Sequence, residues 1–458
     1  MPRTRLMLLA AAAILASTAA PSTQTPRPNI VLIVADDMGY ADIGVHGAKD
    51  IPTPNIDAIF ASGIRFTDAY VTGPYCSPTR AGLLTGKYPQ RFGHEFNLGL
   101  GPTTNELGLP LSEATLADRL KAAGYRTALF GKWHLGRGEK YHPQSRGFDE
   151  FFGFLGGAHS YMEIGADGGN PVLDGRKRAA SMPYLTDALA DRAADFVKRH
   201  QTQPFFLYLA FNAVHTPMQA PEKYLARFPH IKDDMRRTYA AMLSAMDDGI
   251  GRTMQALRAS GIENRTLVIF MNDNGGPTMQ GTTINGSSNA PLRGSKRQTY
   301  EGGIRIPFAM QWKGRLTAGQ IDRRPVIQLD VLPTALAVAG VTVDNTWRLD
   351  GVNLMPYLTG QNNGRPHDAL YWRLGQHIAI RQGDWKLVRT SEGPLQQGTP
   401  ESLETLAKAE LYNLTTDIGE RTNVAASEPQ RARELAEAWL RWEKELAKPL
   451  WGPGRGGS

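Results

Sequence analysis

Four short apolar runs recur along the chain, at residues 29–35, 127–130, 204–211 and 266–271. Each is rich in β-branched or aromatic residues and lacks the polar alternation of a strand with one wet face. Continuous runs of this kind are typical of strands that are buried on both faces of a parallel sheet. We therefore expect a central sheet that is mostly parallel.

Helical patterns lie between these runs. Residues 111–123 and 186–199 carry apolar side chains at the spacing of an amphipathic helix. In the second segment Leu189, Ala193 and Phe196 fall on one helical face. Because strands and helices alternate, the expected fold class is α/β, with a large, mostly parallel central sheet flanked by helices.

The pattern changes from about residue 348. Three shorter strand-like segments, residues 368–372, 377–381 and 385–389, are joined by turns. Alternating segments of this length predict a small antiparallel sheet. This part of the chain is therefore expected to form a separate, smaller α+β subdomain.

The C-terminal end predicts a loop and a closing helix. The polar stretch at residues 390–405 is typical of a loop, and residues 428–448 have one apolar face. Ser427 is expected to begin this helix and Pro449 to stop it. We expect a main domain at residues 28–347, the C-terminal subdomain at 348–450 and a disordered tail at 451–458.

The N-terminus has the pattern of a secretory signal peptide at residues 1–20. Arg3 and Arg5 precede an apolar run at residues 6–16, and small residues follow it. The run is too short for a spanning helix, which needs about 20 residues. We expect an exported protein, periplasmic or secreted, with no membrane anchor.

Charge narrows the range of partners only a little. The chain has 458 residues with 51 Lys+Arg and 44 Asp+Glu, a net charge of +7. Removal of residues 1–20 takes two arginines and leaves an excess of positive charge, which suits either solubility or a polyanionic substrate such as a sulfated glycan. No basic run with interleaved aromatic residues is present, so nucleic acid is not expected as a partner.

Polar side chains follow each of the four predicted strands. In an open α/β sheet, ligands bind beyond the carboxyl ends of the strands, so these residues are expected to share one site. Carboxylate and amide oxygens are the ligands of Ca²⁺ or Mg²⁺, whereas zinc prefers more histidine and cysteine. The residues in question are Asp36, Asp37, Lys132, His134, His215, Asp273 and Asn274.

Cys76 is the one cysteine of the chain, so an exported protein cannot use it in an internal disulfide. It lies in a proline-containing loop before a helix that is expected to begin near Thr79. The helix dipole and Arg80 are expected to stabilise its thiolate. A lone cysteine is equally typical of a small, buried apolar residue.

The residues around Cys76 resemble a known signature. C-S-P-T-R followed by A-G-L-L-T-G is similar to the signature of the type I, formylglycine-dependent sulfatases of the alkaline-phosphatase-like superfamily. Further motifs match in order at residues 28–40, 131–136, around His215, at 272–276 and at 291–307. G-D-W-K-L-V and E-L-Y-N-L-T-T-D in the C-terminal part also match. The resemblance spans nearly the whole chain after the expected signal peptide.

The resemblance implies a modified residue and a metal. In this family the cysteine, here Cys76, is converted after translation to formylglycine, whose hydrate is the nucleophile. The maturation enzyme reads the cysteine, proline and arginine of the signature. An oxygen of modified Cys76 would complete a calcium site, and Asp273 would also help to deprotonate the attacking hydroxyl. The implied protein ligands of calcium are Asp36, Asp37, Asp273 and Asn274.

The resemblance also assigns the remaining charged residues. Arg80 and Lys132 would hold the hydrate and sulfate oxygens. His215 and Lys296 would bind sulfate and protonate the leaving alcohol. His134 would then deprotonate the remaining hydroxyl, so that sulfate leaves and the aldehyde is regenerated.

Substrate-binding residues are less well defined by the sequence. The family places a further polar residue after the segment that is here residues 147–153, and His159, Ser160 and Tyr161 are the candidates. A substrate rim is expected from residues 156–182 together with loop residues near His94, Trp347 and His377.

The expected activity is hydrolysis of a sulfate monoester on a sulfated saccharide or an aryl sulfate. A phosphate or phosphonate monoester hydrolase of the same superfamily is an alternative, because the same cationic cluster suits phosphoryl transfer. A sulfated-glycan binding protein that never acquires formylglycine is a second alternative.

Overall fold

The computed structural model describes residues 27–99, 105–162, 169–180, 182–391, 393, 395–396, 398, 400 and 402–453. The expected signal peptide at residues 1–20 and the end of the expected tail, residues 454–458, lie outside this range. None of the helices in the described part is both long and apolar enough to cross a membrane.

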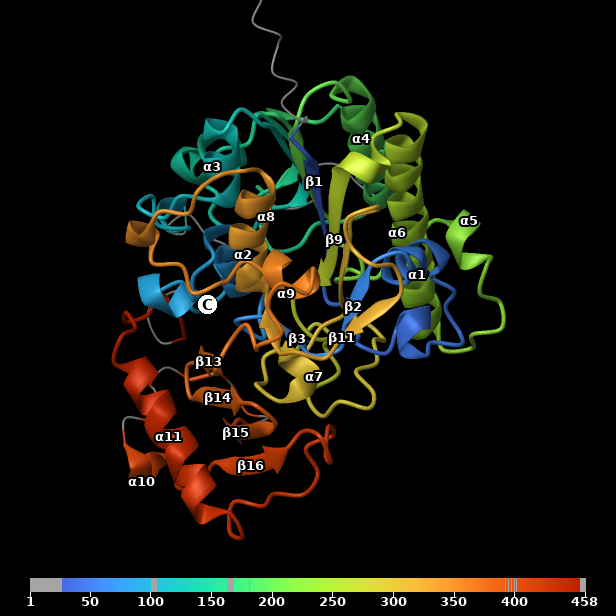
Figure 1. Cartoon of the computed structure of the whole chain (residues 1–458). Helices are drawn as coiled ribbons and strands as arrows, with labels where there is room; N and C mark the ends of the chain where they lie inside the picture. Colours follow the sequence, from blue (N-terminus) through green and yellow to red (C-terminus); the bar gives the residue numbers. More distant parts are fainter. Residues whose placement is uncertain are drawn as a thin grey trace, which may run out of the picture.

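A ten-stranded sheet forms the centre of the main domain (Figure 1). Its middle strand β1 (Asn29–Ala35) pairs in parallel with β8 (Phe205–Ala210) and β9 (Thr266–Asn272). Beyond β8 lie the parallel strands β4 (Arg126–Lys132) and β5 (Glu150–Phe154). All four predicted strands are therefore confirmed as neighbours in a mostly parallel sheet.

The edges of the sheet are antiparallel or mixed. The strand β10 (Phe308–Gln311) runs antiparallel to β9 and to β2 (Ile64–Phe66), and β11 (Gln320–Asp322) closes that edge. At the other edge β6 (Leu173–Asp174) and β7 (Lys177–Arg178) form a short hairpin. A separate two-stranded pair joins β3 (Ala69–Tyr70) to β12 (Val326–Ile327).

Helices cover both faces of the sheet, as Figure 1 shows. Alternate residues of β1 point into two different cores. Val31 packs with the helices α1 (Pro54–Ala61), α4 (Leu185–Arg199) and α6 (Asp234–Ala259). Leu32 lies in the core that contains α2 (Cys76–Thr85), α3 (Leu116–Ala122) and α8 (Val331–Val338). The α/β prediction is confirmed.

Several helices in the described part of the chain are short. The single α-helical turns α5 (Glu222–Leu225) and α7 (Glu301–Ile304) lie before residue 348, and α9 (Met355–Leu358) lies after it. Further 3₁₀ turns lie at Gly44–His46, Pro89–Phe92, Glu139–Tyr141, Pro143–Ser145, Glu263–Arg265, Gln328–Asp330 and Asn345–Trp347.

The C-terminal part forms the predicted antiparallel sheet. Its strands β13 (Leu370–Leu374), β14 (His377–Gln382) and β15 (Trp385–Arg389) follow one another, and β16 (Glu410–Asn413) adds a fourth strand. The helices α10 (Leu403–Leu406) and α11 (Pro429–Glu443) lie beside it. Trp372 and Trp439 share a core cluster with Leu32 of β1, so this part packs on the main domain without a separate core.

Three predicted boundaries were wrong. The helix expected at residues 111–123 begins at Leu116, because Thr115 forms a capping box with Asp118. The closing helix ends at Glu443, not at residue 448. Its N-cap is Glu428 and not Ser427, whose hydroxyl donates to the Val424 carbonyl. The expected tail begins too early, because Trp451 is buried and its indole N–H donates to the Phe96 carbonyl.

Candidate active site

The predicted polar residues meet at the carboxyl ends of the central strands. Ala35 of β1 is in register with Asn272 of β9, so the residues that follow the two strands emerge side by side. These are Asp36 with Asp37 and Asp273 with Asn274. Lys132 is the last residue of β4, and its ammonium reaches the same point. The shared site that the strand ends predict is therefore formed.

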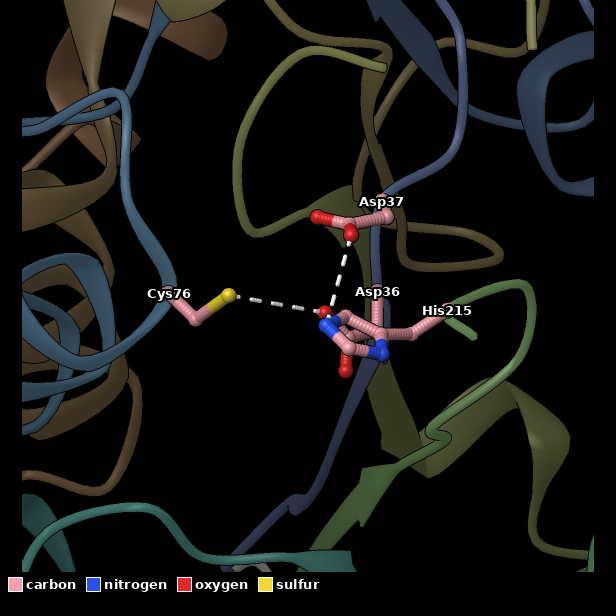
Figure 2. Close-up of side chains that lie close together, drawn as sticks. All are labelled: Asp36, Asp37, Cys76 and His215. Carbon is pink, nitrogen blue, oxygen red and sulfur yellow. Dashed lines mark hydrogen bonds and ion pairs between the residues drawn. The ribbon is translucent and has the colours of Figure 1, made fainter. Parts of the chain in front are cut away.

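Two aspartates, the cysteine and a histidine form the centre of the cluster. Ligand atoms of Asp36, Asp37, Cys76 and His215 all lie within 4.8 Å of one another, and all four residues are buried. Figure 2 shows the Cys76 sulfur directed at Asp36, with the His215 ring beside the two aspartates. Asp37 has a φ of 60°, a left-handed turn that directs the chain away from β1 at this point.

Each of three buried carboxylates has its own cation. Lys132 Nζ is 2.6 Å from Asp36 Oδ2, and Lys296 Nζ is 2.7 Å from Asp37 Oδ2. Arg80 Nη2 is 2.8 Å from Asp273 Oδ2, and no side chain of these pairs is more than 3% exposed. Since the formal charges cancel, a divalent cation would make the cluster positive and suited to an anion.

Asn274 has one amide atom that no group in the described chain satisfies. Its Nδ2 donates to Asp37 Oδ1 at 2.7 Å, whereas its buried Oδ1 has no hydrogen-bond partner. A buried acceptor without a partner is costly unless a ligand completes it. Together with the adjacent carboxylates, this oxygen fits a hard divalent cation such as calcium. Asp273 contributes less directly, because Arg80 already occupies its Oδ2.

The two adjacent aspartates differ in their pKa values. Burial and the nearby Asp273 carboxylate raise the pKa of Asp36 to about 8. Burial also acts to raise the pKa of Asp37, but the charge of Lys296 and its hydrogen bond outweigh burial and hold the pKa below the ordinary value. Of these two adjacent carboxyl groups, Asp37 is therefore the one that carries the negative charge in the unliganded cluster.

Cys76 is the first residue of α2, and its Sγ lies 3.8 Å from Asp36 Oδ1. Burial raises the pKa of its thiol to about 12, although Lys132 and Lys296 act in the opposite direction. The prediction of a stabilised thiolate was wrong, because loss of hydration outweighs the helix N-terminus and the nearby cations. The expected helix start near Thr79 was also three residues too late.

The two histidines of the cluster are buried and neutral. Burial lowers the pKa of His215 to about 3, and burial together with Lys132 holds the pKa of His134 well below its ordinary value. His215 Nδ1 donates to the Thr216 carbonyl at 2.6 Å, so its Nε2, 3.5 Å from Asp37, is the unprotonated nitrogen. His134 Nδ1 has no hydrogen-bond partner among the described residues. Both rings can therefore accept a proton.

Comparison with known proteins agrees with this geometry. The sulfatase family model matches residues 28–341, which is more than half of the chain. This chain belongs to the sulfatase family. A second model, N-sulphoglucosamine sulphohydrolase, C-terminal, matches residues 294–438 of the sulfatase. As a family member, the protein is a sulfuric ester hydrolase.

Several named sulfatases are similar over most of their length. Human N-acetylgalactosamine-6-sulfatase is 34% identical over 92% of this chain and 86% of its own. Mouse steryl-sulfatase is 31% identical over 96% of this chain and 86% of its own. The crystal structure of Ps i-CgsB in complex with k-i-k-neocarrahexaose is 37% identical with a TM-score of 0.84, covering 93% of this chain and 94% of that one.

The three predicted substrate-binding residues of this sulfatase are buried. The Tyr161 hydroxyl lies within hydrogen-bond distance of the backbone carbonyls of Asn212 and His215, so its one proton ties it to the His215 loop. The Ser160 hydroxyl donates to the Gln219 side chain, and His159 Nδ1 donates to the Ser160 carbonyl. Substrate contact by these residues stays a prediction.

The residues that mark the expected substrate rim differ in exposure. His94 is fully buried and His377 is 3% exposed, whereas contact between the loops near them and a substrate stays a prediction. His377 Nδ1 lies 2.9 Å from the carbonyl of Arg297, which follows Lys296. Trp347 lies against Arg119, whose guanidinium is 3.4 Å from the ring centroid. Residues 163–168 and 181 of the expected rim lie outside the described residues.

Two further residues of the site were not predicted. The Thr283 hydroxyl donates to Asp37 Oδ2 at 3.0 Å, and Asn285 Nδ2 donates to the Asp37 and Val214 carbonyls. Both belong to a loop without hydrophobic periodicity, so the sequence pattern could not place them. The signal that was available is their position between the 272–276 and 291–307 motifs.

Proposed function

We propose that this sulfatase removes sulfate from a sulfated saccharide, using a formylglycine made from Cys76 and a calcium ion. The observation that carries the proposal is the buried charge-paired cluster around Cys76, with the unpartnered Asn274 oxygen inside it. Saccharide substrates are favoured by two similar proteins, N-acetylgalactosamine-6-sulfatase and Ps i-CgsB in complex with k-i-k-neocarrahexaose. The similarity to steryl-sulfatase makes a sterol sulfate a substrate to include in tests.

Four oxygen-bearing residues would hold the calcium ion, and the ion would neutralise charge on the transferring group. They are Asp36, Asp37, Asp273 and Asn274. When formed, the hydrate of formylglycine supplies the hydroxyl that accepts the sulfuryl group from the ester and later releases it as sulfate. The buried thiol is a poor nucleophile at neutral pH, because burial raises its pKa to about 12.

The cations of the cluster would stabilise the transferring group. Burial lowers the pKa of Lys296, but Asp37 and the other acidic groups outweigh it, so the pKa is raised and the ammonium keeps its charge. Lys132, Arg80 and Lys296 would spread positive charge around the sulfate oxygens in a site without bulk water. Their carboxylate partners fix their positions before the substrate binds.

Proton transfers would fall to four residues. Asp273 would help to take the proton from the attacking hydroxyl. His215 and Lys296 would bind the sulfate, and Lys296, whose ammonium keeps its charge, would pass a proton to the leaving alcohol; His215 would share this role only after it has itself taken up a proton. His134, neutral and with a buried unpartnered Nδ1, would take the proton of the remaining hydroxyl as sulfate leaves.

A phosphate or phosphonate monoester hydrolase is the alternative of the same fold. The phosphonate monoester hydrolase of Agrobacterium radiobacter has a TM-score of 0.61 at 21% identity, which supports a shared fold alone. Release of sulfate and phosphate from matched aryl esters separates the two activities. A preference for phosphate contradicts our proposal.

The substrate is tested by a screen of defined sulfated mono- and oligosaccharides with protein matured by a formylglycine-generating enzyme. We expect desulfation of a saccharide and none by Cys76→Ala. Glycan binding without turnover, with an intact thiol at residue 76, would instead support a binding protein that is never matured. We also propose that the chain is exported to the periplasm or secreted, on the basis of residues 1–20.

A further inference from the structure

A short segment links the helix that carries Cys76 to the C-terminal subdomain. We call this segment, residues 94–97, the bracket; its sequence is H-E-F-N. Its first three residues are buried. Two of its side chains contact the subdomain, and the other two contact the N-terminus of α2.

The bracket is fixed to the subdomain by a buried ion pair. Glu95 Oε2 lies 2.6 Å from Arg373 Nη2 of β13, and Glu95 Oε1 accepts the Gly375 N–H at 2.7 Å. The Phe96 carbonyl accepts the indole N–H of Trp451 at 2.8 Å. Because Glu95 and Arg373 are both almost fully buried, this end of the bracket has little freedom to move.

Toward the active site, the bracket supplies the cap that α2 lacks. Tyr75 is the N-cap residue, and its side chain makes no capping hydrogen bond. Asn97 Oδ1 instead accepts the Ser77 N–H at 2.9 Å. A side-chain oxygen at this N–H satisfies a donor that the helix cannot satisfy itself. Cys76 lies between the N-cap and the capped residue.

His94 acts on the other polar group of Ser77. His94 Nε2 is 2.6 Å from Ser77 Oγ, and that hydroxyl donates to the His134 carbonyl at 2.6 Å. A serine has a single hydroxyl proton, so His94 must donate from Nε2. The hydrogen bonds therefore run in one direction, from His94 through Ser77 to His134.

His134, at the end of this series of hydrogen bonds, has a strained backbone that its neighbours must hold in place. His134 has a φ of 58°, in the left-handed region that residues other than glycine rarely adopt. Its carbonyl is held by Ser77, and Gly157 lies against its ring, where a Cβ would be 2.7 Å from Nε2. A backbone in this conformation persists only when its surroundings fix it.

We propose that His94 is a positioning residue, which holds His134 in its left-handed conformation through the Ser77 hydroxyl. The consequence for turnover rests on the proposed function, in which His134 takes a proton during sulfate release. In this proposal His94 acts through its hydrogen bond with Ser77.

The test compares two substitutions of His94 with a matched control, all matured in the same way. His94→Phe keeps a ring against Trp451 but removes the donor, whereas His94→Gln keeps a donor near the same place. His142→Phe is the control, because His142 is also buried and packs edge-on against an aromatic ring, that of Phe151. For each variant we measure the formylglycine content, the unfolding temperature, and kcat and KM for 4-nitrophenyl sulfate. We also determine its crystal structure.

For His94→Phe we expect kcat to fall roughly 10- to 100-fold with KM unchanged, as for a small misplacement of a reacting group. We expect His94→Gln to restore most of kcat, His142→Phe to match the parent, and the crystal structure of His94→Phe to show a displaced His134. If His94→Phe does not fold, Ser77→Ala tests the same series of hydrogen bonds, because it removes the Ser77 hydroxyl that lies between His94 and His134.

The inference is overturned if His94→Phe keeps the kcat of the parent protein, or if His134 has not moved in its crystal structure. It is also overturned if kcat falls in His94→Phe and is equally low in His94→Gln. Failure of the proposed function gives a different result. In that case the matured parent itself releases no sulfate, while the position of His134 in the His94→Phe crystal structure still decides the inference.

Discussion

Glu301 and Lys386 form a fully buried ion pair, with 2.8 Å between Oε1 and Nζ, which joins α7 to β15 of the C-terminal sheet. Lys386 is also 2.8 Å from Glu420 Oε1, and Glu301 Oε2 is 3.0 Å from Arg305 Nη1. Gly303 lies in α7 with Glu301, and its carbonyl accepts the N–H of Gly275, the residue after Asn274. The subdomain thus supports the loop that bears the proposed calcium ligands.

We predict that Lys386→Met lowers the free energy of unfolding by about 3–5 kcal/mol, because two buried carboxylates lose their shared cation. Chemical denaturation measures the change. Arg433→Met is the control, since Arg433 pairs with Glu437 on the exposed face of α11 and its loss should leave stability nearly unchanged. Equal stability of the two variants would contradict the role given to this ion pair.

Removal of divalent cations should destabilise the protein and stop turnover. A ligand present at 100 times its Kd stabilises the folded state by about 2.7 kcal/mol, so added calcium should raise the unfolding temperature of chelator-treated protein. Asn274→Leu removes the unpartnered oxygen and should weaken calcium binding by at least about 10-fold. Asn264→Leu, at an exposed position, serves as the control. An unfolding temperature that does not respond to calcium argues against the site.

Stability should also depend on His367. Its Nε2 lies 2.8 Å from Asp330 Oδ1. Burial alone would lower the pKa of His367, but Asp330 outweighs it and holds the pKa above the ordinary value of 6.5. This contribution is therefore complete below pH 6.5 and is lost as the pH rises through the folded-state pKa.

We expect His367→Gln to reduce stability more at pH 6 than at pH 9, as measured by urea unfolding at both values. His230→Gln, at an exposed position, should show no such difference. A deficit of His367→Gln that is the same at both pH values would mean that Asp330 does not hold a charged histidine.

Gly157→Ala tests how tightly the His134 ring is enclosed. A Cβ at residue 157 would lie 2.7 Å from both Cε1 and Nε2 of His134, so the ring must move. We expect kcat to fall roughly 10- to 100-fold, because a reacting group is displaced. Gly393→Ala is the control, since its Cβ would meet nothing closer than 3.9 Å. Unchanged turnover by Gly157→Ala would show that the ring position matters little.

The elements that could be predicted from the sequence are those with a clear local pattern of apolar residues. The central strands are continuous apolar runs, and the helix at Leu185–Arg199 has a clear apolar face. Ends of the other three predicted helices were missed by up to five residues. The capping box at Thr115, the start at Cys76 and the termination at Glu443 depend on individual side chains. The strand β16 was not predicted, because it is short and is defined by its pairing with β15, which the local sequence does not show.

The candidate site was predicted well where residues follow strands or belong to motifs. Burial was the quantity that the sequence could not give. It reversed the expected stabilisation of the Cys76 thiolate and placed the His94 side chain inside the protein. Thr283 and Asn285 contact Asp37 from a loop, and only the folded chain brings them there.

The central claim is that sulfate release depends on conversion of Cys76 to formylglycine. The most direct measurement is the mass of the peptide that carries residue 76, taken on the same protein samples whose sulfate release is assayed. We predict that the rate rises in proportion to the fraction of aldehyde and is absent in Cys76→Ala. Hydrolysis at the full rate by protein whose residue 76 is an unaltered cysteine would contradict the account.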